Sequence, residues 1–281
     1  NTTNAKQPNN AKQSGKSIKN IKHEMRQNIF ITGASKGIGR QLAIEYARRG
    51  NTLYLSSRNT DRLQELTAIL NSAGATAYYS QCNVTSPENV KSSFKDAIDK
   101  LHLIDIVILN AGISKTSYFK DFNIEEFKRV IDVNLYGVIN CFDIALQYLL
   151  KQGFGKIVVI SSIADSRGMP GSGSYNASKA AVSTVFESAR AELAQHNIQL
   201  ITVRPGFIKT DLTSKNKFPM PFLMDVEKAA KIIINGIDKS KKVISFPFPM
   251  TTLTTLLKIL PASVYDFASK NIISPYRKKS E

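Results

Sequence analysis

The sequence predicts an α/β protein built on one doubly wound parallel sheet of about seven strands, with helices on both faces. Short apolar segments alternate with longer segments of helical periodicity from residue 28 to residue 245. The apolar segments are nearly continuous, which is typical of strands buried on both faces of a parallel sheet. A length of 281 residues with 42% apolar residues suits one large core. A C-terminal helical extension is expected beyond the sheet.

The order of the expected elements follows from the places where the periodicity changes. The expected strands cover residues 29–31, 53–55, 77–82, 104–109, 157–160, 198–203 and 242–245. The expected helices run from the glycine-rich turn to residue 49 and then over residues 61–73, 87–101, 123–151, 175–196 and 225–237. Because strands alternate with helices, we expect the strands to run parallel.

The two ends of the chain differ from its middle. Residues 1–27 carry six basic residues against Glu24 and almost no large apolar side chain, so this basic tail is expected to be disordered. Residues 28–245 are expected to form the folded domain. Residues 246–281 fit two short amphipathic helices broken at Pro261. We expect this extension to pack on the domain, at a subunit interface or on a membrane surface.

Composition narrows the function classes. The formal net charge is +16, but the sequence has no basic motif interleaved with aromatic residues and no helix-turn-helix pattern, so no nucleic-acid partner is expected. Cys82 and Cys141 lie in apolar segments and suit neither a disulfide framework nor a metal site. The sequence shows no run of 18 apolar residues and no secretory signal. A cytoplasmic location is therefore expected, with peripheral membrane association left open.

A glycine-rich turn follows the first expected strand and opens a helix, which is the context of a dinucleotide-binding loop. Gly33 allows a tight turn, Gly37 lets the backbone approach a pyrophosphate, and Gly39 lets the helix pack close to the sheet. The unpaired N–H groups at the helix N-terminus favour the phosphates. The residues of this loop expected to bind a cofactor are Gly33, Ser35, Lys36, Gly37, Ile38 and Gly39.

The residues after the second expected strand indicate which dinucleotide is bound. NAD-binding proteins place an acidic residue there, which accepts hydrogen bonds from the ribose hydroxyls. Here Ser57-Arg58 follows the strand, and no carboxylate precedes Asp61. Arg58 can pair with a 2′-phosphate through its planar guanidinium, and Lys36 offers a second cation. NADP(H) is therefore expected in preference to NAD(H).

A tyrosine and a lysine occur four residues apart in an expected helix, so Tyr175 and Lys179 lie on one face of it. A phenol has a pKa of about 10, and a nearby ammonium lowers this value toward neutral pH. Ser162 lies 13 residues before Tyr175, at the end of the expected strand 157–160, with Ser161 beside it as the alternative. The lysine beside the phenol predicts proton transfer by Tyr175.

Together these motifs resemble the short-chain dehydrogenase/reductase family, in its NADP(H)-preferring type with a Tyr-x-x-x-Lys motif. The resemblance spans roughly residues 28–245 and implies a Rossmann-like catalytic domain there. It implies a catalytic set in which Ser162 orients the substrate and Asn134 holds a water behind the lysine. That set is Asn134, Ser162, Tyr175 and Lys179. Further cofactor contacts are implied for Asn83, Val84, Asn110, Ala111, Gly112, Tyr175, Lys179, Pro205, Gly206, Ile208 and Thr210. Asn83 departs from the family's aspartate at this position.

The expected activity is hydride transfer between NADP(H) and a carbonyl or secondary alcohol. Residues 210–224 fall where the family has a mobile lid and include Phe218, Met220 and Phe222, which suits an apolar or lipid-like ketone or ordinary lid packing. The alternative is a catalytically silent nucleotide-binding regulatory or interaction protein. The family commonly packs subunits through the helices at 123–151 and 175–196, so a homodimer or homotetramer is expected.

Overall fold

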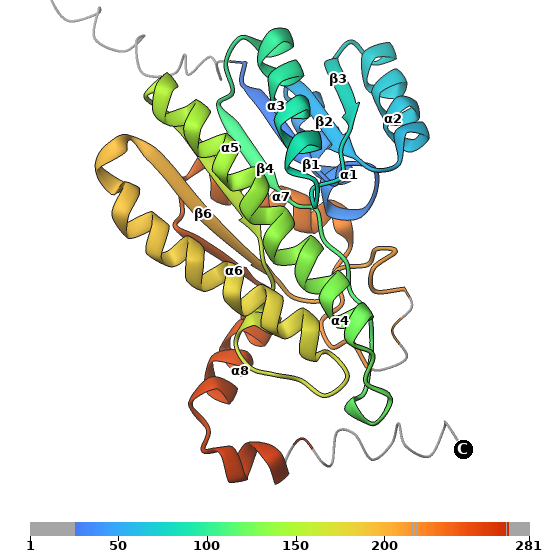
Figure 1. Cartoon of the computed structure of the whole chain (residues 1–281), viewed down its shortest axis with the longest axis vertical. Helices are drawn as coiled ribbons and strands as arrows, with labels where there is room; N and C mark the ends of the chain where they lie inside the picture. Colours follow the sequence, from blue (N-terminus) through green and yellow to red (C-terminus); the bar gives the residue numbers. More distant parts are fainter. Residues whose placement is uncertain (1–25, 215, 217–218, 268, 270–281) are drawn as a thin grey trace, which may run out of the picture.

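A seven-stranded parallel sheet forms the centre of the molecule in the computed structural model, which describes residues 26–214, 216, 219–267 and 269 (Figure 1). The strands are β1 (Asn28–Thr32), β2 (Thr52–Ser57), β3 (Thr76–Gln81), β4 (Ile106–Leu109), β5 (Gly155–Ile160), β6 (Ile198–Pro205) and β7 (Val243–Phe246). Their order is β3-β2-β1-β4-β5-β6-β7, and each neighbouring pair is parallel. The predicted fold class is confirmed.

The sheet reverses its winding at β1, because β2 lies on one side of that strand and β4 on the other. Ligands of open α/β sheets bind in the crevice where the loops after two such strands part. The glycine-rich turn leaves β1 here, and Asn110-Ala111-Gly112 leaves β4 beside it. The fold therefore brings two predicted cofactor motifs to one point at the carboxyl edge of the sheet.

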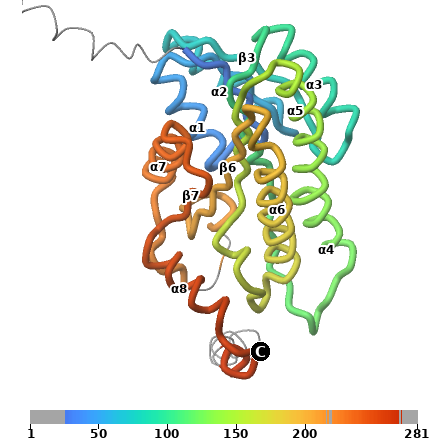
Figure 2. Tube along the Cα trace, turned by 90° about the vertical axis from the view of Figure 1, so that its left-hand side faces the viewer, coloured from blue at the N-terminus to red at the C-terminus, as the bar shows by residue number. Residues whose placement is uncertain are grey.

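Helices cover both faces of the sheet (Figures 1 and 2). One layer consists of α1 (Gly37–Arg48), α2 (Thr60–Ser72) and α7 (Val226–Asp238). The other layer consists of α3 (Pro87–Leu101), α4 (Ile124–Ile131), α5 (Gly137–Gln152) and α6 (Gly173–Glu192). The continuous apolar strands separate the two cores, since successive side chains of a strand point to opposite faces.

Strand β1 shows how the two cores are divided. Ile29 and Ile31 pack toward the layer of α1, α2 and α7, whereas Phe30 points toward α3. The Phe30 ring stacks on Phe94 with centroids 4.2 Å apart and on Tyr54 with centroids 5.4 Å apart. Burying a side chain of this size contributes about 2 kcal/mol on an area basis. β1 is thus anchored from both sides, and the turn that follows it has a fixed starting point.

The long helical segment predicted at residues 123–151 contains a feature that the sequence did not predict. A π-helical turn, η2 (Asp132–Tyr136), separates α4 from α5. Such turns re-aim side chains and are frequent at functional sites.

The combined segment Ile124–Gln152 is long and apolar enough to cross a membrane, judged by length and composition alone. The search for continuous apolar runs in the sequence did not indicate such a segment. One face of α5 packs in the core through Val138, Cys141 and Leu149, as expected of a helix that covers a sheet.

The predicted C-terminal helices are present. α8 (Phe248–Ile259) is followed, after Pro261, by a helical segment at 262–267. Arg167, from the loop after β5, donates to the carbonyl oxygens of Leu257 at 2.6 Å and Leu260 at 2.7 Å, at the C-terminal end of α8. Its guanidinium also lies 4.1 Å from the ring centroid of Tyr265, whose hydroxyl donates to the Gly168 carbonyl. The extension is therefore tied to a loop at the carboxyl edge of the sheet.

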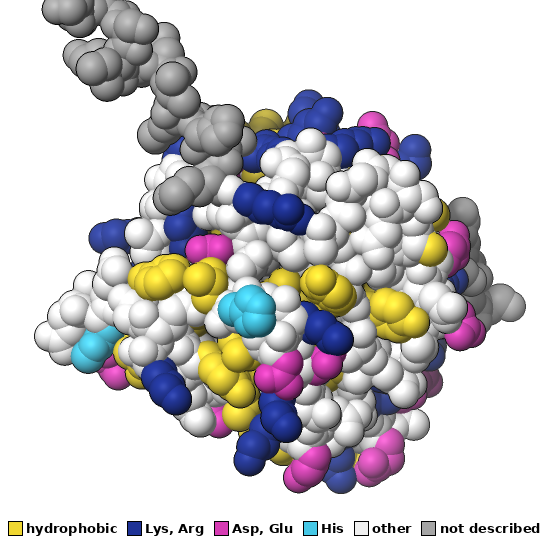
Figure 3. All heavy atoms as spheres, turned by 90° about the horizontal axis from the view of Figure 1, so that it is seen from above, with side chains coloured by type: hydrophobic (Ala, Val, Ile, Leu, Met, Phe, Trp, Pro, Cys, Tyr) yellow, Lys and Arg dark blue, Asp and Glu magenta, His cyan; other side chains and the backbone are white. Residues whose placement is uncertain are grey.

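The basic charge of the chain is dispersed over the face seen from above the sheet. Figure 3 shows the end remote from the carboxyl edge, where basic, acidic and apolar side chains alternate without a single basic patch. The expected disordered tail falls mostly on residues 1–25, which lie outside the described residues, as do positions 270–281 of the extension.

Candidate active site

Helix α6 carries the predicted proton-transfer pair at the carboxyl edge of the sheet. Tyr175 and Lys179 are one turn apart, with the Lys179 Nζ 5.8 Å from the centroid of the Tyr175 ring. Lys179 is buried, and its Nζ donates to the carbonyl of Ile160 at 2.8 Å, at the end of β5. The lysine therefore contacts the end of β5 on the face of α6 that it shares with the tyrosine, and the four-residue spacing predicted the shared face.

The two candidate serines separate clearly. Ser162 lies beside Tyr175, where its hydroxyl acts to lower the pKa of the phenol, and it accepts from the Ala164 N–H at 3.1 Å. The Ser161 hydroxyl instead donates to the backbone carbonyl of Lys179 at 3.2 Å and pairs with Ser183 at 2.7 Å. Ser162 is thus the serine that the fold brings to the tyrosine, while Ser161 ties β5 to the backbone of α6.

Asn134 lies in the π-helical turn and is fully buried. Its Oδ1 accepts from the Ile113 N–H at 2.8 Å, and its Nδ2 donates to the Ile113 carbonyl at 2.9 Å and to Ser178 at 3.1 Å. A Cβ added to Gly112 would lie 3.3 Å from the Asn134 Oδ1 and 3.6 Å from the Lys179 Nζ. Asn134 therefore joins the loop after β4 to α6, next to the lysine.

Burial dominates the protonation of the pair. It raises the pKa of Tyr175, an effect that the Ser162 hydrogen bond opposes and the nearby Asp165 carboxylate reinforces. Burial lowers the pKa of Lys179 to about 8, although Asp165 acts in the opposite direction. The net direction for Tyr175 differs from the sequence-based expectation that Lys179 lowers it. The physical reason is desolvation, which disfavours the phenolate and the ammonium alike.

The space around the glycines of the glycine-rich turn suits the close approach of a dinucleotide. Gly33 has φ +67°, and a Cβ there would lie 2.8 Å from the Ala111 Cα. A Cβ on Gly39 would lie 2.5 Å from the Asn110 Nδ2 and 2.6 Å from the Gly33 carbonyl oxygen. The Thr32 hydroxyl accepts from the backbone N–H groups of Asn110 at 3.0 Å and Ala111 at 3.1 Å. The loops after β1 and β4 are packed too closely for side chains, which leaves backbone N–H groups to face a ligand.

The N-terminus of α1 has the chemistry that a pyrophosphate needs. Its N-cap residue, Lys36, makes no side-chain hydrogen bond to the first turn, so no side chain caps the N–H groups there. Ser35 and Ile38 are partly exposed in the same turn, and Arg58 is exposed after β2. These residues fit a phosphorylated dinucleotide, with Lys36 and Arg58 as the cations available for an additional phosphate.

Two residues near these cations were missed by the sequence analysis. Asp211, from the lid segment, lies 3.8 Å from the Lys36 Nζ and 3.5 Å from Arg62 Nη1. Arg62 lies one turn after Arg58 in the chain and could have been noticed by that spacing. Asp211 could not, because it lies some 175 positions after Lys36 in the sequence, and only the fold brings it to the glycine-rich turn.

The remaining predicted cofactor contacts lie around the same edge. The Asn83 Oδ1 already accepts from the backbone N–H of Thr85 at 3.3 Å and from its hydroxyl at 3.0 Å, so an adenine amino group would share that oxygen. Val84 is buried, and its carbonyl accepts from Asn140 at 3.0 Å. These contacts fix the loop after β3 to α5.

The loop after β6 reaches the glycine-rich turn. A Cβ on Gly37 would lie 3.5 Å from the Thr210 side chain, and the Pro205 carbonyl accepts from Ser162 at 3.4 Å. Gly206 has no room for a side chain, because its Cβ would lie 2.8 Å from Pro247. Ile208 is buried and forms a parallel β-bridge with Met224, so the two ends of the lid segment lie close together. Phe218, one of the predicted lid residues, lies outside the described residues.

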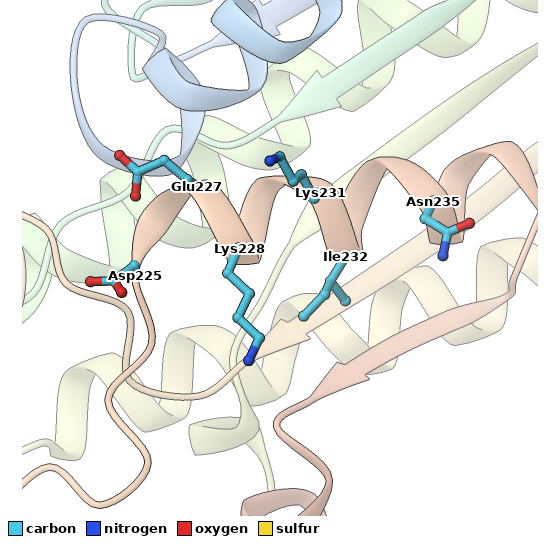
Figure 4. Close-up of a pocket in the computed structure, with 6 residues that line it drawn as sticks. All are labelled: Asp225, Glu227, Lys228, Lys231, Ile232 and Asn235. Atoms are coloured by element: carbon cyan, nitrogen blue, oxygen red, sulfur yellow. The ribbon is translucent and has the colours of Figure 1, made fainter.

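Two hollows differ in their relation to this edge. A small one of about 20 Å³ lies at the start of α6. It is lined by Lys115, Ser117, Phe119, Phe122, Asn123, Glu126, Phe127, Gly173 and Ser174. The larger one, about 550 Å³, is an open depression along the outer face of α7, lined mainly by exposed side chains such as Glu227 and Lys228 (Figure 4). Ser174, which lines the small hollow, directly precedes Tyr175 in α6.

Comparisons with known proteins show the family of the chain. A family model described as short chain dehydrogenase matches residues 27–219. The chain belongs to the short-chain dehydrogenase family. An uncharacterized oxidoreductase of Myxococcus xanthus is 33% identical over 243 residues, covering 86% of this chain and 96% of that protein. A 3-oxoacyl-[acyl-carrier-protein] reductase of Staphylococcus epidermidis is 32% identical over 191 residues, covering 68% and 78%.

A solved structure extends this likeness to three dimensions. An alcohol dehydrogenase from the archaeon Thermococcus sibiricus, complexed with 5-hydroxy-NADP, superposes with a TM-score of 0.71 at 27% identity, covering 79% of this chain and 95% of that one. As a short-chain dehydrogenase, the chain is an oxidoreductase with a nicotinamide-cofactor fold, and the alternative of a catalytically silent binding protein is not favoured.

Proposed function

We propose that this chain reduces carbonyl compounds with NADPH and that Tyr175 is the proton donor. The observation that carries the proposal is the meeting of Ser162, Tyr175 and Lys179 at the carboxyl edge of the sheet, directly beside Gly112 of the cofactor edge. The Ser162 hydroxyl lies close enough to Tyr175 to act on the pKa of its phenol, so one substrate oxygen can contact both side chains. A binding protein without chemistry would not require this arrangement.

The residues divide the reaction between them. When bound, the reduced nicotinamide supplies the hydride that forms the new C–H bond at the carbonyl carbon. Tyr175 gives its phenolic proton to the carbonyl oxygen, so that an alcohol is formed and a phenolate remains on the enzyme. Ser162 donates a hydrogen bond to the same oxygen while negative charge develops on it. Lys179 stabilises the phenolate and, with Asn134 behind it, provides the route by which the proton is replaced.

The preference for NADPH rests on the charges after β1 and β2. Lys36 and Arg58 are exposed there, and no carboxylate stands at the end of β2, where an NAD-binding protein needs one. A planar guanidinium pairs well with a phosphate, and a second cation adds to the attraction. The Thermococcus sibiricus relative is complexed with an NADP derivative, which agrees with this assignment.

An apolar ketone is the substrate class that best fits the surroundings of Tyr175. Phe119, Phe122 and Phe127 line the small hollow at the start of α6, and Phe119 stacks on Phe122 with centroids 5.7 Å apart. Phe222 and Leu223 are exposed on the lid segment. Apolar walls with a few polar groups at the reacting atom are typical of sites for apolar ligands.

We also propose that the chain forms a homodimer or homotetramer and has no nucleic-acid partner. Tyr136, Leu150 and Val185 are exposed apolar residues along the layer of α5 and α6. Packing of these helices against a second copy would cover them. Sedimentation of the purified chain tests this directly.

The test is a fluorescence titration with NADPH and with NADH, followed by oxidation of the tighter nucleotide with aldehydes, apolar ketones and 3-oxoacyl thioesters. We expect tighter binding of NADPH and turnover of the apolar ketones. Failure of both nucleotides to bind would refute the assignment of the cofactor edge. Binding without turnover of any carbonyl would refute the proposed reaction.

A further inference from the structure

A buried carboxylate lies next to the catalytic residues and was not part of the predicted site. Asp165 ends the short 3₁₀ turn η3 (Ile163–Asp165), three residues after Ser162, and its side chain is only 4% exposed. Arg204, near the end of β6, forms a salt bridge with this carboxylate. The Arg204 Nε donates to both oxygens at 3.0 and 2.8 Å, and its Nη2 donates to Oδ1 at 2.5 Å.

The same carboxylate is bound from α6. The Ser183 hydroxyl donates to Asp165 Oδ2 at 2.6 Å and pairs with Ser161 at 2.7 Å. Ser183 lies four residues after Lys179, so Tyr175, Lys179 and Ser183 form one row along the helix. Asp165 is thus bonded to the helix that carries the proton donor and to the strand beside it.

Each of the three segments that meet at Asp165 carries a part of the candidate site. The turn after β5 carries Ser162, α6 carries Tyr175 and Lys179, and β6 leads from Arg204 into Pro205. The Pro205 carbonyl accepts from Ser162 at 3.4 Å. A shift of the Asp165 carboxylate would therefore change the distance between Ser162 and Tyr175. The reaction depends on that distance, because both side chains must contact the same substrate oxygen.

Asp165 is also the charge that acts on the catalytic pair. Its negative charge favours the protonated forms of both Tyr175 and Lys179. Arg204 on β6 is the counter-ion of Asp165. The π-helical turn η2 presents the neutral amide of Asn134 to α6.

Other charged residues near the start of α6 include Arg167, whose carbonyl accepts from Asn176 and whose guanidinium is bound to the end of α8. Lys115 and Glu126 line the small hollow at Ser174, and Glu126 is already paired with Arg129 at 2.8 Å. Of these charges, Asp165 is the one that acts on both Tyr175 and Lys179.

We propose that Asp165 is a positioning residue for the reaction. Held by Arg204 and Ser183, it fixes Ser162 against α6 and keeps a negative charge near Tyr175 and Lys179. The proposal rests on the proposed function for its kinetic consequences. An ion pair that only stabilised the fold would affect the yield of folded protein and not the pH range.

Opposite charge changes test this proposal. Asp165→Asn removes the negative charge, so the alkaline limb of kcat is expected to move to lower pH. Arg204→Gln leaves Asp165 unbalanced, so the limb is expected to move to higher pH. The double variant restores neutrality and should return the limb close to that of the parent. A limb that stays fixed, or that moves the same way in both single variants, would overturn the proposal.

Ser183→Ala separates position from charge, because it keeps both ions and removes the tie to α6. We expect a loss in kcat of about tenfold with an unmoved pH limb and unchanged NADPH binding. Unchanged kcat would overturn the positioning part. If Asp165→Asn does not fold, the other two variants still test the proposal. Arg204→Gln must move the alkaline limb, and Ser183→Ala must leave it in place.

A readout without turnover separates failure of this proposal from failure of the proposed function. The acetylation of Lys179 by acetic anhydride, followed by mass spectrometry over a range of pH, reports the ionisation of the lysine in the cofactor-free protein. Its midpoint is expected to fall in Asp165→Asn and to rise in Arg204→Gln. Absent turnover in the parent chain would refute the proposed function alone. Equal midpoints in all variants would refute the role of Asp165.

Discussion

The edge formed by the loops after β1 and β4, which we propose binds the cofactor, and the apolar surface of α8 and the segment before α4, which we expect to face the substrate, are built in different ways. At the cofactor edge, glycines and backbone hydrogen bonds join the loops after β1 and β4, and an added Cβ would approach other atoms to within 2.5–2.8 Å. On the substrate side, apolar side chains from distant segments are exposed, with Phe248 80%, Ile259 75% and Phe119 72% accessible. Steric contacts therefore fix the cofactor edge, so no side chain can be added at its glycines. The apolar surface has room for side chains that differ in size and polarity.

The largest effect is expected where the cofactor edge has no room. Gly39→Ala would place a methyl group 2.5 Å from the Asn110 Nδ2 and 2.6 Å from the Gly33 carbonyl. Overpacking of this kind costs about 2 kcal/mol, and the turn must open to relieve it. We expect NADPH binding to be lost in a fluorescence titration.

The matched control for this change is Gly50→Ala. Gly50 has φ +79°, but no atom lies within 4 Å of its added Cβ. It should lose about 1 kcal/mol of stability from backbone strain and keep NADPH binding. Normal binding by Gly39→Ala would contradict the steric account of the cofactor edge.

The second prediction concerns cofactor choice. Arg58→Gln removes the guanidinium assigned to the 2′-phosphate, and a hydrogen bond to a charged group is worth about 2 kcal/mol, or about a 30-fold change in Kd. NADPH affinity should fall by this amount while NADH affinity stays the same. Arg48→Gln is the control, because Arg48 is paired with Glu45 at 3.0 Å at the other end of α1. Equal losses for both nucleotides would remove Arg58 from the phosphate site.

The pH dependence follows from the buried lysine. Since burial lowers the pKa of Lys179 to about 8, the ammonium is present below that pH and is lost above it. The value of kcat/KM for reduction should therefore be level at lower pH and fall as pH rises through about 8, because this parameter reports the free enzyme. Lys179→Arg keeps its charge at high pH, so any residual activity should lack this fall. A fall at the same pH in both proteins would assign it to another group.

The smallest effect is expected on the substrate side. Arg167→Ala removes the donor that holds the carbonyls of Leu257 and Leu260, and a net hydrogen-bond contribution of about 1 kcal/mol corresponds to about fivefold. We expect KM for a long apolar ketone to rise by this factor, with KM for a small aldehyde unchanged. Arg190→Ala on α6 serves as a control remote from α8. An equal change for both substrates would show that α8 does not border the substrate.

The sequence was sufficient for features that depend on local spacing. The alternation of apolar runs predicted the parallel sheet, and four-residue spacing placed Tyr175 and Lys179 on one face of α6. The glycine-rich turn was readable because its steric demands are met by three glycines within seven positions. These features are short-range consequences of backbone geometry, so the amino-acid sequence alone is enough to predict them.

Features that depend on distant segments were not readable. Asp165 and Arg204 are 39 positions apart, and Asp211 reaches Lys36 only because the lid folds back over the glycine-rich turn. The π-helical turn at Asn134 interrupts a pattern that looks continuous in sequence. The direction of the Tyr175 pKa was mispredicted because the spacing revealed the neighbouring lysine but not the burial that outweighs it.

The most direct test of the central claim is a comparison of the parent chain with Tyr175→Phe in NADPH oxidation by an apolar ketone. The substitution removes the phenolic oxygen and keeps the ring, so NADPH binding serves as the internal control. Loss of general acid catalysis predicts a fall in kcat of about 1,000-fold with NADPH binding retained. Turnover by Tyr175→Phe at the rate of the parent chain would contradict the assignment of Tyr175 as the proton donor.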